Sequence, residues 1–392
     1  MQFDLTEHQR AIRADAREFA RDRIAPRARE LDRAGEHPTD ILAAAGDRGY
    51  AGLTVGDDYG GAGEGLVELA LVTEELSAVL MPVASALALH LGVAEAVERL
   101  GTDAQRERFL TGMADFETVG ALGLSEEHAG SDKTGIETTA RRDGTEWVID
   151  GHKRWVTNLQ HADEVLTYAR TGESNGNDDG DGDGDGGADA GDAADGITAF
   201  LVPADEYEVE TVWDTLGART VKSPKATLSR VRVDDARQVG TVGEGLAERG
   251  QLRTGINVPA RGVGIARATL DATVEQTRNR QQGGQAIADH QGVRWRVAEM
   301  AERVDVARLL LLRAATRLEQ GGDARREFAM AKTYATEAAV ENANDALQLH
   351  GGIGYTTERD VERHLRDARL LTIAGGPNEG HLDTLADAVY DQ

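Results

Sequence analysis

The sequence contains no cysteine, which excludes disulfide bonds, a thiol nucleophile and a thiolate metal site. Redox chemistry in this protein would therefore have to come from a bound cofactor. Positive charge is also scarce, because 43 lysines and arginines stand against 69 acidic residues and the formal net charge is -26. Nucleic acids and anionic membrane surfaces attract basic proteins, so we expect neither as a partner.

Long apolar runs are missing as well. None approaches the roughly 18 residues that cross a bilayer, and the first ten residues lack a basic stretch followed by an apolar one. We therefore expect no membrane insertion and a cytoplasmic location. An acidic surface with few lysines resembles the halophilic style, in which hydrated carboxylates keep a protein soluble in concentrated salt. An ordinary acidic enzyme is the alternative. The lysines are Lys133, Lys153, Lys222, Lys225 and Lys332.

A segment rich in glycine and aspartate interrupts the sequence between residues 171 and 196. It carries nine acidic residues and no basic one, so it repels itself and cannot bury apolar surface. We expect a flexible insert. Its Asp-x-Asp runs do not predict a calcium loop, because an EF-hand needs an acidic twelfth residue and a helix on each side.

The rest of the chain predicts helices, then a compact β domain, then helices. Two capping boxes, at Thr6–Gln9 and Thr102–Gln105, open helices in the first part, and helical periodicity returns after Gly243. At 392 residues the chain exceeds the size of a single core. We therefore predict an α+β protein with an N-terminal helical domain at 1–117, a central β-barrel or sandwich at 118–236, and a C-terminal four-helix bundle at 237–392.

One stretch of the β domain predicts a hairpin with an aromatic face. Residues 147–149 and 155–157 read as its two strands, with Asp150-Gly151 as the turn. Strand alternation would then point Trp155 and Thr157 to the same side, as a flat aromatic surface beside a hydroxyl. That combination suits a flavin ring, although core packing is the ordinary role of a tryptophan in a strand.

Two glycine-rich stretches are candidates for a cofactor loop. Residues 123–135 end a predicted strand and supply closely spaced hydroxyls and backbone amides, which can hold a phosphate. Taken alone, an ordinary polar turn is the more common meaning of such a loop. The stretch Arg261-Gly262-Val263-Gly264 looks dinucleotide-like, but it lies in a helical region with no strand before it, so we reject that interpretation.

These segments together resemble the acyl-CoA dehydrogenases. The resemblance covers essentially the whole chain except the acidic insert, and two of its motifs are highly specific. The first is residues 123–135, apart from Glu127, where the family usually has proline. The second is residues 348–355, followed by Glu358, Arg363 and Asp367, and between the two motifs the family pattern is matched by Arg280, Gly284 and Gln291.

The resemblance implies an FAD held without a Rossmann fold and an acyl-CoA substrate. The flavin would carry the hydride chemistry while the protein orients it against the substrate. Electron-transferring flavoprotein is the family's usual electron acceptor. Ser131 would contact both substrate and cofactor. The other residues that the analogy assigns to the cofactor within one subunit are Leu122, Leu124, Ser125, Trp155, Thr157 and Asn378.

Five further cofactor residues would come from a neighbouring subunit. A site shared in this way requires a homo-oligomer, and the usual family state is a homotetramer. These residues are Arg280, Gln291, Gln348, Gly351 and Gly352.

The sequence departs from the family where the catalytic base should be. Most members place a glutamate shortly after the Arg366-Asp367-Ala368 segment, and Gly375 occupies that position here. Other members keep the base on a helix that would begin near residue 251, where this chain has Thr254. Two usual CoA contacts are also replaced, by Leu252 and Gly255. Losing a positioned base typically costs about 10² to 10⁴-fold in rate.

Three explanations remain open at this point. Glu379, four residues beyond Gly375, could act as a relocated base, although a carboxylate at the start of a helix usually serves the helix dipole. The chain could instead be a catalytically degenerate flavin-binding subunit of a hetero-oligomer. It could also be a flavin-dependent oxygenase on the same fold, in which no α-proton base is needed.

Overall fold

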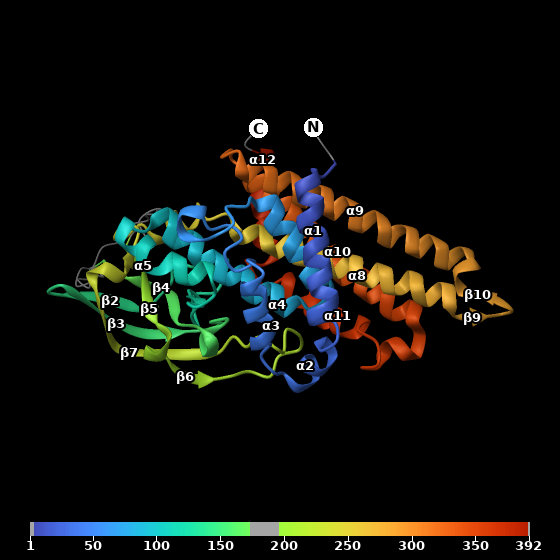
Figure 1. Ribbon diagram of the computed structural model, residues 1–392, viewed down its shortest axis with the longest axis horizontal. Coiled ribbons are helices and arrows are strands. Elements are labelled where there is room, and N and C mark those ends of the chain that lie inside the picture. The colour runs from blue at the N-terminus through green and yellow to red at the C-terminus, as the bar shows by residue number, and fades with distance from the viewer. Residues whose placement is uncertain (1–3, 173–195, 391–392) are drawn as a thin grey trace, which may run out of the picture.

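The computed structural model describes residues 4–172 and 196–390, so the expectation of a flexible insert falls almost entirely outside the described residues. A sheet lies at one end of the long axis, helices fill the middle, and a small hairpin forms the opposite tip (Figure 1). The α+β architecture is confirmed, with helical N-terminal and C-terminal parts on either side of a β region. The domain bounds at 1–117, 118–236 and 237–392 stay predictions.

The N-terminal part is helical, and both capping boxes are present as expected. In each box the threonine hydroxyl accepts from the glutamine N–H, and the glutamine side chain accepts in return from the threonine N–H. The helices are α1 (Glu7–Phe19), which continues as a π-helical turn (Ala20–Ile24), α2 (Ala28–Ala34), α3 (Thr39–Asp47), α4 (Leu66–Leu100) and α5 (Asp103–Ala114).

Helix α4 is the central element of the N-terminal part, and most of its residues are buried. It is kinked, because Leu80 has non-helical angles and Pro82 lacks the N–H that would bond to the preceding turn. The expectation of no apolar run of membrane-spanning length is wrong for this helix. One 18-residue window is apolar enough to cross a membrane, yet 72% of it is buried inside the fold, as in a core helix.

The central sheet has eight strands in the order β6-β7-β3-β2-β4-β5-β8, with β1 added in parallel beside β4. It is a half-barrel. β4 and β5 pair up to the edge of the acidic insert, where the last residue of β4, Arg170, lies opposite the first residue of β5, Ile197. The strands are β1 (Gly120–Gly123), β2 (Thr139–Asp143), β3 (Glu146–Lys153), β4 (Glu164–Arg170), β5 (Ile197–Pro203), β6 (Glu208–Thr211), β7 (Lys225–Asp234) and β8 (Gln238–Val239).

The predicted hairpin around Asp150-Gly151 is wrong. β3 runs straight through these two residues, and its pairing with β7 shifts register there, as at a β-bulge. The real turn is at Gly144, where β2 meets β3. Residues 155–157 follow β3 as a loop, so strand alternation does not place Trp155 and Thr157 on one face. A glycine with a positive φ occurs at β-bulges as well as in turns, so the Asp-Gly pair alone does not distinguish a bulge from a turn.

The C-terminal part is a bundle of long helices with the small hairpin at its tip (Figure 1). Helix α8 packs tightly, because a Cβ on Gly262 would come within 2.7 Å of the Ala335 carbonyl and one on Gly264 within 2.4 Å of the Glu74 carbonyl. These glycines therefore allow close helix packing. This agrees with the rejection of a dinucleotide-binding loop at this stretch. The elements are α7 (Gly245–Arg249), α8 (Asn257–Asn279), β9 (Gln281–Gln282), β10 (Gln285–Ala286), α9 (Gln291–Glu319), α10 (Arg325–His350), α11 (Val361–Leu371) and α12 (Asn378–Tyr390).

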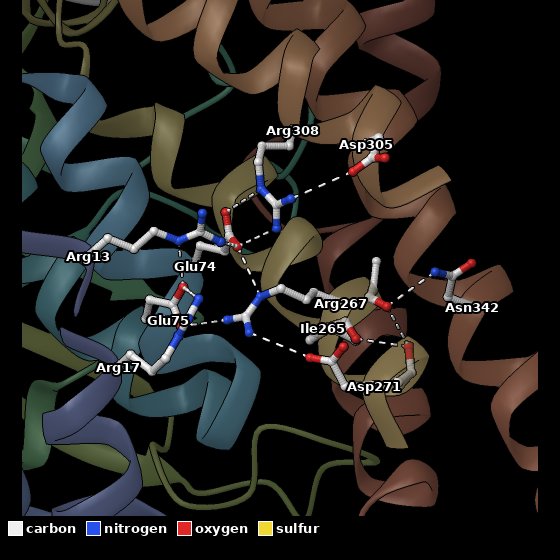
Figure 2. A network of polar contacts seen from close by, with 12 residues as sticks. Arg13, Arg17, Glu74, Glu75, Ile265, Arg267, Asp271, Asp305, Arg308 and Asn342 are labelled. Carbon is white, nitrogen blue, oxygen red and sulfur yellow. Dashed lines mark hydrogen bonds and ion pairs between the residues drawn. The ribbon is translucent and has the colours of Figure 1, made fainter. Parts of the chain in front are cut away.

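Two adjacent glutamates on α4 tie the N-terminal helices to the bundle (Figure 2). Glu74 binds Arg13 of α1, Arg267 of α8 and Arg308 of α9 at 2.8, 3.0 and 2.6 Å. Glu75 binds Arg13 and Arg267, both at 2.7 Å. Burial alone would raise the pKa of Glu74. The hydrogen bond from Arg308 and the positive charges of Arg308, Arg13 and Arg267 outweigh burial and lower this pKa below its ordinary value. The network thus joins four helices through two buried carboxylates.

Candidate functional site

The glycine-rich loop after β1 is fastened to the end of β3 by a buried ion pair. Lys153 Nζ lies 2.5 Å from Glu126 Oε1 and donates to the Tyr168 carbonyl at 2.6 Å. Glu126 also accepts from the N–H groups of Glu137 and Thr138, at 2.6 and 3.2 Å. Burial lowers the pKa of Lys153 to about 8. These buried contacts therefore fix the conformation of the loop.

The turn after β3 has an unusual backbone conformation. Trp155 and Asn158 have φ of 58° and 71°, in a region that residues other than glycine seldom adopt. The Asn158 amide donates to the Ala86 carbonyl on α4 at 3.0 Å and to the Gly120 carbonyl on β1 at 3.3 Å. Such strain persists only where the surroundings impose it and is frequent at functional sites. Here α4 and β1 impose it.

This turn presents an aromatic surface that fits a flavin ring. The Trp155 side chain is 53% exposed and packs on Trp213, with ring centroids 4.3 Å apart and 32° between the planes. The Thr157 and Ser223 hydroxyls are 2.7 Å apart, so Thr157 is oriented by a partner. An indole ring that stays partly exposed can still bind a planar ligand. Trp155 and Thr157 thus belong to one turn, and each packs against a residue of the segment between β6 and β7.

The remaining flavin candidates of the β domain lie on β1 and the loop after it. Leu124 is buried, Leu122 and Ser125 are half-buried, and Ser131 is exposed. The Arg154 N–H donates to the Ser125 carbonyl at 2.7 Å, which holds this loop against the residue before Trp155. The structure therefore brings the loop and the aromatic turn together, and their contacts with a cofactor stay predictions.

A second group of candidates lies at the other end of the molecule. Helix α8 ends just before Arg280 and α9 begins at Gln291, beside the β9–β10 hairpin at the tip opposite the sheet (Figure 1). Gln348, Gly351 and Gly352 stand at the end of α10, and the described side chains and glycines of this group are exposed. One chain thus does not bring the two groups together, which is compatible with the predicted sharing between subunits.

The backbone at Gly375 is built around glycine. Gly375 and Gly376 have φ of 70° and 90°, in the left-handed region. A Cβ on Gly375 would come within 2.9 Å of Val258 Cγ2 on α8, closer than real Cβ contacts. A glutamate at position 375 would therefore require both an unfavourable φ and a movement of Val258.

Lys332 of α10 holds this loop from inside the bundle. Its Nζ donates to the Gly376 carbonyl at 2.6 Å and to Asn378 Oδ1 at 2.8 Å. Asn378 also accepts from the Thr336 hydroxyl at 3.1 Å and is 6% exposed. The Asn378 side chain, predicted as a cofactor contact, is thus engaged with the interior of the bundle, and a role toward the cofactor stays a prediction.

The structure adds a candidate base that the sequence did not suggest, His381 of α12. His381 Nε2 lies 3.1 Å from the Gly375 carbonyl. Because a carbonyl only accepts, Nε2 carries the proton in the neutral ring and Nδ1 is the basic nitrogen. Burial lowers the pKa of His381 below 6.5; the hydrogen bond to the Gly375 carbonyl opposes this decrease, and the charges of Lys332 and Lys133 add to it. The imidazole is therefore neutral at pH 7 and can accept a proton beside the Gly375 loop.

The carboxylates near the two predicted base positions are less suitable than His381. Glu379 stands in the first turn of α12 with an exposed side chain. The helix expected near residue 251 begins at Asn257 instead, and Thr254 lies in a short turn before it. The Glu95 carboxylate of α4 is beside this turn, but it accepts from the N–H groups of Arg253 and Thr254 at 2.9 Å each. Its oxygens serve to cap the turn.

Leu252 and Gly255, the predicted replacements of two CoA contacts, lie in apolar surroundings. A Cβ on Gly255 would meet the Phe328 ring at 3.6 Å, and this ring packs edge-on against His381 with centroids 5.5 Å apart. Leu252 is half-buried against the core that α4 and α5 form with the sheet. Gly255 thus lies beside an aromatic ring that also packs against the candidate base.

Three family models match the chain in sequence order. They are described as the acyl-CoA dehydrogenase N-terminal domain at residues 6–117, the middle domain at 121–231 and the C-terminal domain at 252–390. The chain is 34% identical over 385 residues to the probable acyl-CoA dehydrogenase YngJ of Bacillus subtilis, covering 97% of each protein.

Solved structures agree with this assignment. The butyryl-CoA dehydrogenase of Megasphaera elsdenii is 28% identical with a TM-score of 0.91, and the match covers 100% of both chains. A chain from a structure described as the electron transferring flavoprotein of Acidaminococcus fermentans is 29% identical, with a TM-score of 0.92 and complete coverage of both chains. Relatives and neighbours of this kind are FAD-dependent oxidoreductases. The chain described here therefore belongs to the acyl-CoA dehydrogenase family.

Proposed function

We propose that this protein forms an α,β double bond in an acyl thioester, with His381 taking the proton from the α carbon. Bound FAD would accept the hydride from the β carbon. The leaving proton passes to His381 Nδ1, and the electron pair of the α C–H bond becomes part of the new double bond. Leu122, Leu124, Ser125, Ser131, Trp155 and Thr157 would hold the cofactor on this chain.

The contact between His381 and the Gly375 carbonyl carries this proposal. Gly375 occupies the place of the family's usual base, and the 3.1 Å contact ties the imidazole to that loop while leaving Nδ1 available. A histidine that is neutral at pH 7 can act as a general base. The same argument does not favour the exposed Glu379.

The first test is whether the purified protein carries FAD and whether thioesters reduce it. We expect a yellow protein with a flavin absorption spectrum that bleaches when acyl-CoA is added without oxygen. Because two usual CoA contacts are replaced, pantetheine thioesters belong in the same panel. Colourless protein after refolding with excess FAD would contradict the cofactor. Flavin that no thioester bleaches would favour a degenerate subunit or an oxygen-using enzyme instead.

We also propose a cytoplasmic homotetramer adapted to concentrated salt, with electron-transferring flavoprotein as its acceptor. The exposed second group of cofactor candidates supports sharing between subunits, and the net charge of -26 with five lysines supports adaptation to salt. Light scattering would give the oligomeric state, unfolding in a KCl series would test the salt requirement, and reoxidation of reduced protein by electron-transferring flavoprotein would test the acceptor.

A further inference from the structure

Arg261 on α8 is a buried cation with no carboxylate partner within residues 4–172 and 196–390. The residue is 6% exposed. Its Nη1 donates to Ser85 Oγ at 2.8 Å and lies 3.8 Å from Met81 Sδ, while the buried Nε has no hydrogen-bond partner among the described residues. Burial lowers the pKa of Arg261 to about 10, and no acidic group offsets this effect. A buried charge of this kind is strongly unfavourable without a counter-ion.

A second buried cation lies near Arg261. Lys332 is 0% exposed and donates to two neutral oxygens, the Gly376 carbonyl and Asn378 Oδ1. Burial lowers the pKa of Lys332 to about 8, and the charge of Arg261 contributes to the decrease. Glu379 and Glu337 oppose this decrease at Lys332, whereas neither acts on Arg261. This region of the bundle therefore has an excess of positive charge that centres on Arg261.

Arg261 also lies between the Gly375 loop and the aromatic turn that contains Trp155. Val258, which borders Gly375, precedes Arg261 by three residues on α8, so the two share a helix face about 4.5 Å apart along the axis. On α4, Ser85 binds Arg261 and the next residue, Ala86, binds Asn158 of the aromatic turn. A short acyl chain that starts at the Gly375 loop and runs inward would end near the guanidinium.

We infer that Arg261 binds a carboxylate at the far end of the acyl chain, so that the preferred substrates are thioesters of short dicarboxylic acids. The inference rests on the proposed function, because it assumes that an acyl chain lies against the Gly375 loop. The free Nε would donate to the carboxylate together with the guanidinium nitrogens, and charge-assisted hydrogen bonds of this type are strong and directional. The ligand would supply the counter-ion that the chain itself lacks.

Binding to the FAD-loaded protein tests this inference without requiring turnover. The probes are glutaryl and pentanoyl thioesters of CoA and of pantetheine, which differ at the end of the chain, and binding is followed by the flavin spectrum. We expect glutaryl thioesters to bind about 10 to 100-fold more tightly, as for hydrogen bonds to charged groups. Arg261→Met should abolish this preference. The same substitution at an exposed arginine of α10, Arg326→Met, should keep it.

Thermal unfolding without ligand gives a second readout. Because Arg261→Met removes an uncompensated buried charge and keeps the length of the side chain, the variant should unfold at the same or a higher temperature. A lower temperature would assign Arg261 a structural role and overturn the inference. Equal binding of glutaryl and pentanoyl thioesters would overturn it as well, while leaving the proposed function intact. Absence of binding by every thioester would instead contradict the proposed function itself.

Discussion

Replacing His381 by glutamine should lower the rate of flavin reduction by an acyl thioester by about 10² to 10⁴-fold. Glutamine can still donate to the Gly375 carbonyl, as His381 Nε2 does at 3.1 Å, so the loop should keep its position. Only the basic nitrogen is lost. Stopped-flow mixing without oxygen measures the rate, and unchanged binding of the thioester would show that the loss is chemical.

The pH dependence gives an independent check on the same base. Burial, together with the charges of Lys332 and Lys133, lowers the pKa of His381 below 6.5. Protonation removes the acceptor, so the rate should fall as pH decreases through this lowered pKa and should stay level above it. The His381→Gln variant should lack this decrease. A wild-type rate that does not change with pH in this range would argue against histidine.

Glu379→Gln is the matched control, because Glu379 is the other ionisable residue considered as the base. Its side chain is exposed in the first turn of α12, and its ordinary role is to interact with the helix dipole. The rate should therefore change little. A loss of about 10²-fold in this variant, with His381→Gln unaffected, would show that Glu379 is the relocated base.

Restoring a carboxylate at position 375 requires a second change. A Cβ there would lie 2.9 Å from Val258 Cγ2, so Gly375→Glu alone should fold poorly. Val258→Ala removes that contact, and the double variant should reduce its flavin faster than Val258→Ala alone if a thioester reaches this loop. A glutamate at φ of 70° stays strained in the double variant. Val258→Ala is the reference because it shares the Val258 change and keeps Gly375.

Replacing Glu74 by alanine should reduce the free energy of unfolding by about 3 to 5 kcal/mol, the usual cost of removing one partner from a buried ion pair. Glu74 is 1% exposed and binds Arg13, Arg267 and Arg308. Its loss leaves Arg13 and Arg267 to share Glu75 with Arg17, and leaves Arg308 with the exposed Asp305 (Figure 2). Urea unfolding followed by circular dichroism measures the change.

Asp305→Ala is the control for this network. Asp305 is 77% exposed and lies 3.8 Å from Arg308, so its removal should cost less than about 1 kcal/mol, as for surface ion pairs. High salt should weaken the Asp305 contribution first, because buried pairs are screened less. Similar midpoints for the two variants would mean that the network adds nothing beyond a surface contact.

The sequence by itself determined the architecture and the family. Capping boxes at Thr6 and Thr102, helical periodicity and β-rich runs depend on neighbours a few residues apart, so a linear pattern contains them. The motifs at residues 123–135 and 348–355 likewise depend on the local order of residues, and they indicated the family. Local patterns failed at Asp150-Gly151, because a bulge and a turn use the same residues and only the partner strand β7 distinguishes them.

Only the tertiary structure decided which side chains meet across the fold. His381 contacts the Gly375 carbonyl only six residues earlier, but its ring also packs against Phe328 of α10, and no motif singled out this histidine. The missing partner of Arg261 is equally invisible in a sequence with 69 acidic residues, because the net charge does not show which cations are buried alone. Burial changes the cost of a charge according to its three-dimensional surroundings, and those surroundings come from α4, α8 and α10 packing together.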